Sequence, residues 1–444
     1  MQHENLPQEL VDRCLSQGAD SAEVYLQTSR QLSIEVRNGA LETIQESTSH
    51  GVGFRVFREG RLGFSHSNDL SRASLDEAVA RAVSFARHMS ADEHNILPDD
   101  PGVTEVEGLY DPALGNVSMD RKIEMLEELE NMALSDPRIN KSDGARYGEG
   151  EGTVRLANSN GLVKDHRTTG CSYGVSVVAE KGDQRSSGGE YCSRRFFSDL
   201  PSPEDLSEKA ARSAYEMLDP RMVRTQRAPV IFHPDVAHAL LGGILGAING
   251  ERVLQGASFL AGRLEERIGS GLLTIIDDGT RPRGMASAPF DGEGVPTQRR
   301  VIVENGVLRG FLYNTIVGSR AGVPSTGNAS RGGFSTLPGI GPHAFYVAAG
   351  LADPEEIIRS TPEGLYLKGV TGYGINPVSG DFSGGAQGFW IENGRLAHPV
   401  KGLTIAATAD EMLNGIDMMG NDLDLNRSMT APTFRIREMR VGGM

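Results

Sequence analysis

The chain has 444 residues, of which 59 are acidic and 44 are basic, so its formal net charge is −15 at pH 7. This length exceeds that of one ordinary globular core and predicts two or three domains. An acidic surface repels the phosphate backbone that nucleic-acid-binding proteins must neutralise, which argues against direct contact with DNA or RNA.

The three cysteines, Cys14, Cys171 and Cys192, lie far apart in the sequence. Because they form no CxxC pair, they indicate neither a disulfide framework nor a zinc ribbon, and a reducing compartment suits them. The N-terminal residues lack a basic stretch followed by an apolar one, and no apolar run approaches the roughly 18 residues of a membrane span. We therefore expect a cytoplasmic protein that does not cross a membrane.

Residues 1–105 are predicted to form an α+β domain, an antiparallel meander with packed helices. A helical stripe that stops at Gly18 is followed by alternating residues, which predict two strands joined near Ser29. Asn38-Gly39 is a turn signal. The letters SLDE from residue 74 form a capping-box pattern and predict the start of a further helix.

A polar, acidic segment rich in Pro and Gly covers residues 91–116 and predicts a linker. A middle α+β domain, residues 110–225, is expected to follow it. Near its end, Ser202 is placed as the N-cap and Pro203 as the first residue of a helix.

Residues 226–444 are predicted to form a mostly antiparallel β-sheet or barrel-like domain with one or two helices. Asn305-Gly306 and Asn393-Gly394 each lie between alternating runs, which is a strong hairpin signal. Most of the glycine excess lies beyond Gly242 and is typical of tight turns and close backbone approaches in a sheet.

The first candidate for chemistry is a pair of histidines, His233 and His238, at the start of an apolar run. A zinc protease needs histidine ligands, a third ligand and a general base. Pro234 stands where an H-E motif places the base, and only Asp235 is near enough to replace it. A spacing of five residues also sets the two rings about 140° apart on a regular helix. The alternative is a helix N-terminus, with His233 near the N-cap, Pro234 at N1 and Asp235 in the first turn.

The second candidate is the Gly-rich loop of residues 319–342, which contains Arg320, Asn328 and Arg331. Loops of this kind present backbone amides and a guanidinium group to a carboxylate or carbonyl, so these side chains are candidate peptide-binding residues. A solvated connection remains the alternative. No phosphate-binding loop or dinucleotide-binding fingerprint is present in the sequence.

Several long segments point to a known family. They are GADSAEVYL at 18–26, FLAGRLEERI at 259–268, ASAPFDGEGVPTQRR at 286–300, STGNASR at 325–331 and FWIENGRLAHPV at 389–400. With them the chain resembles the TldD/PmbA family, once described as modulators of DNA gyrase and now grouped as metalloproteases. The resemblance implies two branches. The TldD branch carries an H-E-x-x-x-H zinc motif and a distant C-terminal cysteine ligand, whereas the TldE/PmbA branch lacks these ligands and forms a heteromer with the first.

The resemblance also assigns the zinc-motif positions in this chain. Counted back without gaps from GASFLAGR at 256–263, the two histidines and the glutamate of the motif fall on Leu241, Gly246 and Gly242. His233 and His238 have the same spacing but lie eight residues upstream. The last cysteine is Cys192, so the third ligand is missing as well. The resemblance therefore favours the metal-free TldE/PmbA-type branch.

From this resemblance we expect a non-catalytic subunit of a TldD/E-type metalloprotease complex that acts on unfolded peptides. Zinc is expected in a TldD-like partner and not in this chain, which would hold an extended peptide by strand addition. Two alternatives stay open. One is a self-sufficient metallopeptidase that uses His233 and His238 with a further carboxylate. The other is a protein-binding regulator of gyrase or of a toxin–antitoxin pair, which follows from the older name of the family.

Overall fold

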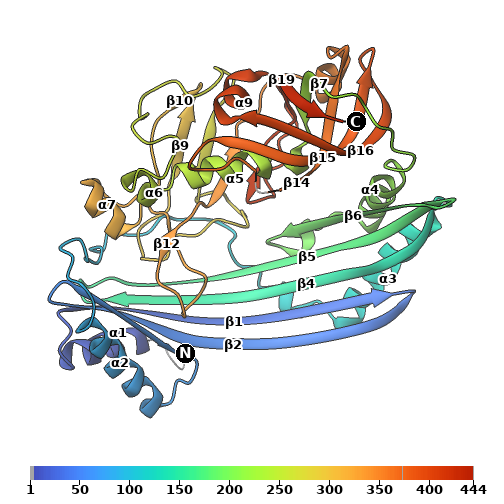
Figure 1. Cartoon of the computed structure of the whole chain (residues 1–444). Coiled ribbons are helices and arrows are strands. Elements are labelled where there is room, and N and C mark those ends of the chain that lie inside the picture. The colour runs from blue at the N-terminus through green and yellow to red at the C-terminus, as the bar shows by residue number, and fades with distance from the viewer. Residues whose placement is uncertain (1–4, 373, 444) are drawn as a thin grey trace.

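The computed structural model describes residues 5–372 and 374–443, and its mixture of helices and strands confirms the predicted α+β class. Its largest element is a long antiparallel sheet, curved beneath the C-terminal region (Figure 1). The sheet has the order β3-β2-β1-β4-β5-β6. Its strands are β1 (Ser21–Arg37), β2 (Ala40–Arg58), β3 (Arg61–Ser67), β4 (Ile139–Asn158), β5 (Val163–Lys181) and β6 (Gln184–Arg194).

The first two predicted segments share this sheet. Strand β1 pairs with β4 from Glu23↔Asn158 to Val36↔Ala145, so residues before and after the predicted linker are hydrogen-bonded neighbours. The linker itself packs against the sheet, because Asn158 Nδ2 donates to the carbonyl oxygen of Pro98 at 2.9 Å. The structure thus joins residues 1–105 and 110–225 through one continuous set of backbone hydrogen bonds.

Strand β1 differs from the sequence prediction. The break near Ser29 is wrong, because β1 runs unbroken from Ser21 to Arg37 and pairs there with both β2 and β4. The apolar alternation stops at the polar middle of the strand, where no helix covers the sheet. The turn at Asn38 is confirmed by its left-handed backbone, with φ of 54°.

Helices cover one face of the sheet and leave the other to the C-terminal region. Helices α1 (Leu6–Ser16) and α2 (Arg72–Ala86) pack at one end, and α3 (Met119–Ser135) and α4 (Pro203–Tyr215) pack at the other. Ser202 caps α4 as predicted. Helix α2 begins earlier than predicted, because Ser71 has an extended backbone and its Oγ accepts from Ser74 N.

The predicted barrel-like domain in the C-terminal region is confirmed, and its barrel is closed. Its strands follow the order β16-β15-β14-β7-β19, and a further pairing of β16 with β19 completes the ring. They are β7 (Gln226–Phe232), β14 (Glu363–Thr371), β15 (Asp381–Glu392), β16 (Arg395–Thr408) and β19 (Phe434–Gly442), with β17 (Ile416–Met419) added on β19. The hairpin turns at Asn305 and Asn393 are confirmed by φ angles of 47° and 52°.

A second sheet lies beside the barrel, in the order β10-β9-β8-β13-β18. Its strands are β8 (Ile275–Asp278), β9 (Arg299–Glu304), β10 (Val307–Leu308), β13 (Ala344–Val347) and β18 (Met429–Thr430), and a small ladder joins β11 (Ala329–Ser330) to β12 (Gly339–Ile340). Most strand pairings in the C-terminal region are antiparallel. The pairs β14 with β7, in the barrel, and β13 with β18, in the second sheet, are parallel.

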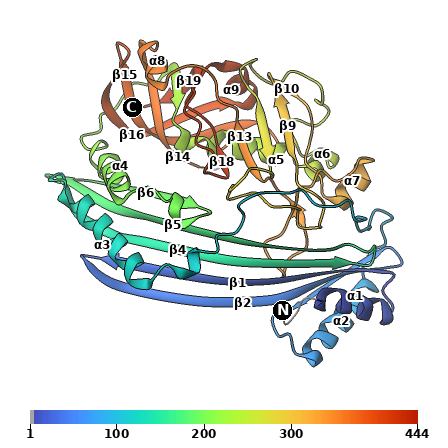
Figure 2. The ribbon, with the colours of Figure 1, turned by 180° about the vertical axis from the view of Figure 1, so that it is seen from behind.

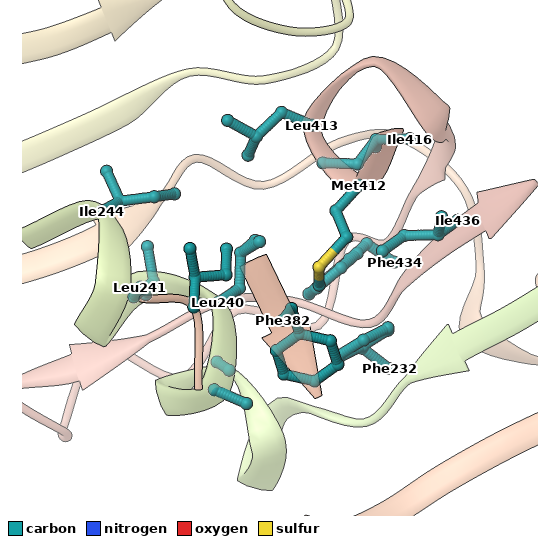
Figure 3. Packing of buried hydrophobic residues seen from close by; sticks show 14 of the residues in the cluster. Phe232, Leu240, Leu241, Ile244, Phe382, Met412, Leu413, Ile416, Phe434 and Ile436 are labelled. Carbon is teal, nitrogen blue, oxygen red and sulfur yellow. The ribbon is translucent and has the colours of Figure 1, made fainter. Parts of the chain in front are cut away.

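The prediction of one or two helices in this region is wrong, because short local helices were not visible in the apolar pattern. The described residues form α5 (His238–Ala247), α6 (Gly250–Leu254), α7 (Thr315–Ala321), α8 (Pro354–Arg359) and α9 (Ala409–Gly415). Helix α5 enters the core, where Leu240, Leu241 and Ile244 belong to one hydrophobic cluster with Phe382 and Phe434 (Figure 3). In the part of the chain that the structure describes, no helix has the length and apolar character needed to span a bilayer.

Candidate functional site

His233 and His238 form the polar entry to helix α5. The His233 side chain accepts a hydrogen bond from Asp235 N at 3.2 Å and lies 3.0 Å from the Asp235 carboxylate. His238 begins α5, with its Nδ1 at 3.1 Å from the Asp235 carbonyl oxygen. Burial raises the pKa of Asp235, but His233 and Arg427 outweigh it and hold this pKa well below the usual range. His233 thus caps a short 3-10 turn, Pro234–Val236, that leads into α5, in the N-terminal arrangement that the sequence offered as the alternative to a metal site.

The positions assigned to the zinc motif lie on α5 itself. Leu241 is fully buried in the hydrophobic core. Gly242 faces open space, and a Cβ atom added to Gly246 would lie 2.9 Å from the side chain of Pro377. A hydrocarbon side chain and two glycines provide no nitrogen, oxygen or sulfur side-chain atom for a metal.

Two of the three predicted peptide-binding residues are buried. Asn328 is 2% exposed, and its Nδ2 donates to Asp277 Oδ2 at 2.7 Å. The Arg331 side chain is also 2% exposed and pairs with Glu23. Arg320 stays half-exposed in α7 and donates to Asp92 at 3.1 and 2.6 Å. The structure does not gather these side chains around one cleft.

Arg331 instead belongs to a buried chain of alternating charges that sequence reasoning missed. It contacts Glu23 of β1, and Arg55 of β2 donates to Glu23 and to Glu293 at 2.6 Å in each case. Each of these four side chains is at most 2% exposed. Thr315 N completes this charge chain by donating to Glu293 Oε2 at 2.8 Å. The charge chain anchors the C-terminal region on the long sheet. Each buried charge in it has an oppositely charged partner, as burial requires.

The face of the long sheet opposite the helices has a neutral centre, here called the neutral belt. Antiparallel partners share a face, so the strand registers place on it one set of small polar residues and glycines. These are Ser29, Gln31 and Ser33 of β1, Gln45, Ser47 and Ser49 of β2, Gly148, Gly150 and Gly152 of β4, and Thr168, Gly170 and Ser172 of β5.

The neutral belt borders a cavity of about 520 Å³. Met285 of the C-terminal region closes part of it, because a Cβ atom on Gly170 would lie 3.0 Å from Met285 Cε. The residues of the neutral belt carry no charge, while Arg30, Glu149, Glu151 and Arg195 also line the cavity. The belt itself offers hydroxyl and side-chain amide groups, because the backbone groups of the inner strands β1 and β4 are paired within the sheet.

Comparisons with known proteins match three stretches of the chain. Family models described as PmbA/TldA metallopeptidase domain 1, central domain and C-terminal domain match residues 22–86, 112–218 and 225–443. The chain belongs to the PmbA/TldD metallopeptidase family. The family resemblance inferred from the sequence segments is confirmed.

Relatives of this PmbA/TldD family member match over almost their whole length. "Metalloprotease PmbA" of Escherichia coli O157:H7 is 31% identical over 96% of this chain and 93% of its own length. A "Metalloprotease PmbA homolog" of Haemophilus influenzae is 30% identical over 95% and 92%. A "Metalloprotease TldD homolog" of the same organism is 26% identical over 96% and 93%.

Solved structures share the fold. A putative modulator of DNA gyrase from Bacteroides thetaiotaomicron superposes with a TM-score of 0.91 at 27% identity, covering 100% of this chain and 99% of the other. TldE from Thermococcus kodakarensis superposes with a TM-score of 0.88 at 24% identity, covering 98% and 99%. The second likeness is one of fold alone.

The family name implies a metal, and we tested the residues of this chain against one. The motif positions Leu241, Gly242 and Gly246 do not fit, because they contribute no donor atoms. His233 and His238 bring two imidazoles near Asp235. Among residues 5–372 and 374–443, however, no group of three or more His, Cys, Asp or Glu side chains is placed to hold a metal ion. The described residues of this chain thus do not fit a zinc ion at the motif positions.

Proposed function

We propose that this chain is the non-catalytic, TldE/PmbA-like subunit of a TldD/E-type cytoplasmic metalloprotease complex that acts on unfolded peptides. The observation that carries the proposal is the chemistry of α5. A protease zinc site needs three protein ligands and a nearby general base, and Leu241, Gly242 and Gly246 supply none of them. Zinc and catalysis are accordingly assigned to a TldD-like partner.

The contribution of this chain would be a surface for the substrate. The neutral belt crosses a sheet whose strand β4 is 20 residues long. Its hydroxyl and amide groups can accept and donate hydrogen bonds along an extended backbone, and its lack of charge favours no particular side chain. Unfolded peptides of varied sequence suit such a surface because their backbone is their common feature.

The test combines zinc analysis with a cleavage assay. The chain is purified without chelator, and its zinc content is measured by mass spectrometry. Cleavage of an unstructured peptide is then measured for this chain alone, for a TldD-like subunit alone and for their mixture. We expect no stoichiometric zinc in this chain, no cleavage by it alone and chelator-sensitive cleavage by the mixture.

A double variant, His233→Ala with His238→Ala, separates the proposal from its main alternative. If the unaltered chain binds zinc and cleaves peptide alone, and the double variant loses both properties, the chain is a self-sufficient metallopeptidase and the proposal fails. If zinc content and activity of the chain alone stay at background in both forms, the subunit role stands.

A further inference from the structure

Strand β6 is the outer strand of the long sheet and has an open edge. No strand among the described residues pairs with its outer side. A two-residue turn joins β5 to β6 at the pair Lys181↔Gln184. The closing pair of such a hairpin is hydrogen-bonded, and the pattern then alternates. Arg185, Ser187 and Gly189 therefore direct their backbone N–H and C=O groups outward.

A cleft of about 720 Å³, here called the β6 cleft, follows this open edge. One wall consists of residues 185–190 of β6 together with α4. The opposite wall belongs to the C-terminal region and includes Asp235, Lys368 and Lys401. In Figures 1 and 2, β6 is the strand of the long sheet drawn nearest to that region. The volume lies within the range of about 300–1,000 Å³ typical of ligand sites.

Some charged side chains in the β6 cleft have an oppositely charged partner, and others have none among the described residues. Lys368 pairs with Glu216 across the two walls, and Arg427 pairs with Asp235 at 2.7 Å. Lys209 and Lys401 also line the cleft, and no described residue forms an ion pair or hydrogen bond with either ammonium group. Burial, with the nearby Asp235 carboxylate, raises the pKa of Glu190, so this acid compensates the lysines less well.

We propose that the β6 cleft binds an extended peptide by strand addition to β6, with carboxylate groups of that peptide directed to Lys209 and Lys401. The outward N–H and C=O groups supply the backbone bonds of such a complex, and the unpaired lysines supply a preference for acidic peptides. The identification of this peptide as a substrate segment rests on the proposed function. The binding itself does not.

The binding test uses the full chain and fluorescently labelled unstructured peptides in an anisotropy titration. Peptides of one length carry Asp, Asn or Lys at the same alternate positions, and the Asp peptide is made with a free and with an amidated C-terminus. We expect the Asp peptide to bind more tightly than the Asn peptide, and the Lys peptide to bind most weakly. A difference between the free and amidated forms distinguishes a terminal carboxylate from acidic side chains.

Two variants address the backbone contacts. Ser187→Pro removes one outward N–H and places a ring on the open edge, while the hydrogen bonds to β5 stay intact, since proline is tolerated on this side of an edge strand. We expect it to weaken binding of the Asp peptide about tenfold or more. Ser187→Ala keeps the N–H and serves as the matched control with unchanged binding. Circular dichroism verifies that both variants fold.

Charge variants address the preference for acids. Lys209→Gln and Lys401→Gln are each expected to weaken binding of the Asp peptide several-fold and to reduce its salt dependence. Lys141→Gln, exposed on β4 outside the cleft, is the control. Unchanged binding in the two cleft variants would overturn the assignment of the lysines.

Four outcomes decide the inference as a whole. Equal binding by Ser187→Pro and the unaltered chain overturns strand addition. Absence of peptide binding, together with loss of association between Ser187→Pro and a TldD-like subunit, shows that the cleft is a subunit interface and also overturns it. If the peptide binds but the mixed subunits do not cleave it, the inference stands and the proposed function fails. If the mixed subunits cleave peptide but this chain does not bind it, the proposed function stands and the inference fails.

Discussion

At the scale of single residues, the half-buried His166 of β5 lies in a setting that disfavours its charged form. Its Nδ1 atom is buried without a hydrogen-bond partner among the described residues, and its ring meets Phe290 edge-on with centroids 4.9 Å apart. Burial lowers its pKa to about 4, with Arg195 acting in the same direction and Asp165 opposing it. A histidine in an unfolded chain has a pKa of about 6.5, so protonation favours the unfolded state.

The lowered pKa of His166 makes the folded protein less stable as the pH falls. The stability contributed by neutral His166 is fully present above about pH 6.5 and is lost as the pH falls towards about 4, by at most about 3 kcal/mol. We expect His166→Phe to flatten this part of the stability–pH curve, measured by urea unfolding between pH 7 and 4.5. His50→Phe, exposed on β2, is the control and should leave the slope unchanged. An unaltered slope in His166→Phe would show that other groups cause the loss.

At the scale of elements, α5 carries adjacent glycines with opposite surroundings. A Cβ atom on Gly243 would lie 2.4 Å from both Cβ and the carbonyl oxygen of Ile375, whereas one on Gly242 would meet no described residue within 4 Å. Gly243 therefore permits the close packing of α5 against the chain after β14. Gly242 is exposed on the helix, where the lack of a side chain brings no packing benefit. It only increases the conformational freedom of the unfolded chain.

This contrast predicts opposite effects of the same substitution on one helix. Gly243→Ala should destabilise the protein by about 1–3 kcal/mol through overpacking. Gly242→Ala should stabilise it by up to about 1 kcal/mol through helix propensity. Chemical unfolding of the two variants under one condition provides the comparison. If Gly243→Ala were neutral, α5 would be free to move away from Ile375, and the packing argument would be lost.

At the scale of the whole molecule, the alternating charges of Arg331, Glu23, Arg55 and Glu293 hold the C-terminal region on the long sheet. Removal of Arg55 would leave the buried Glu293 without its charged partner and Glu23 with Arg331 alone. Breaking such a buried pair costs about 3–5 kcal/mol, so we expect Arg55→Leu to lower the free energy of unfolding by about this amount.

The matched control for Arg55→Leu is Arg30→Leu. Arg30 pairs with Glu46 on the surface, where the side chains are 60% and 50% exposed, and such pairs contribute about 0–1 kcal/mol. Urea unfolding of both variants measures the difference. A small effect of Arg55→Leu would mean that water reaches the charge chain and that other contacts fix the C-terminal region.

The sequence alone determined the features that depend on neighbouring residues. Asn38-Gly39, Asn305-Gly306 and Asn393-Gly394 were identified as turns because few residue types adopt the left-handed backbone observed there. Ser202 was identified as a helix cap because its hydroxyl accepts from the nearby Asp205 N at 3.2 Å. The long matching segments determined the family, and the letters at 241–246 determined that no metal-binding side chain stands at the motif.

Tertiary structure decided the features that depend on residues distant in the sequence. Strand β1 crosses its polar middle because β2 and β4 pair on both sides. Arg331 was predicted to face a ligand, yet it contacts Glu23, 308 positions away in the chain. The β6 cleft arises where an edge strand of the long sheet meets the C-terminal region. Local patterns report propensity and capping, but which charges are buried and which strand edges stay open is set only when distant segments pack.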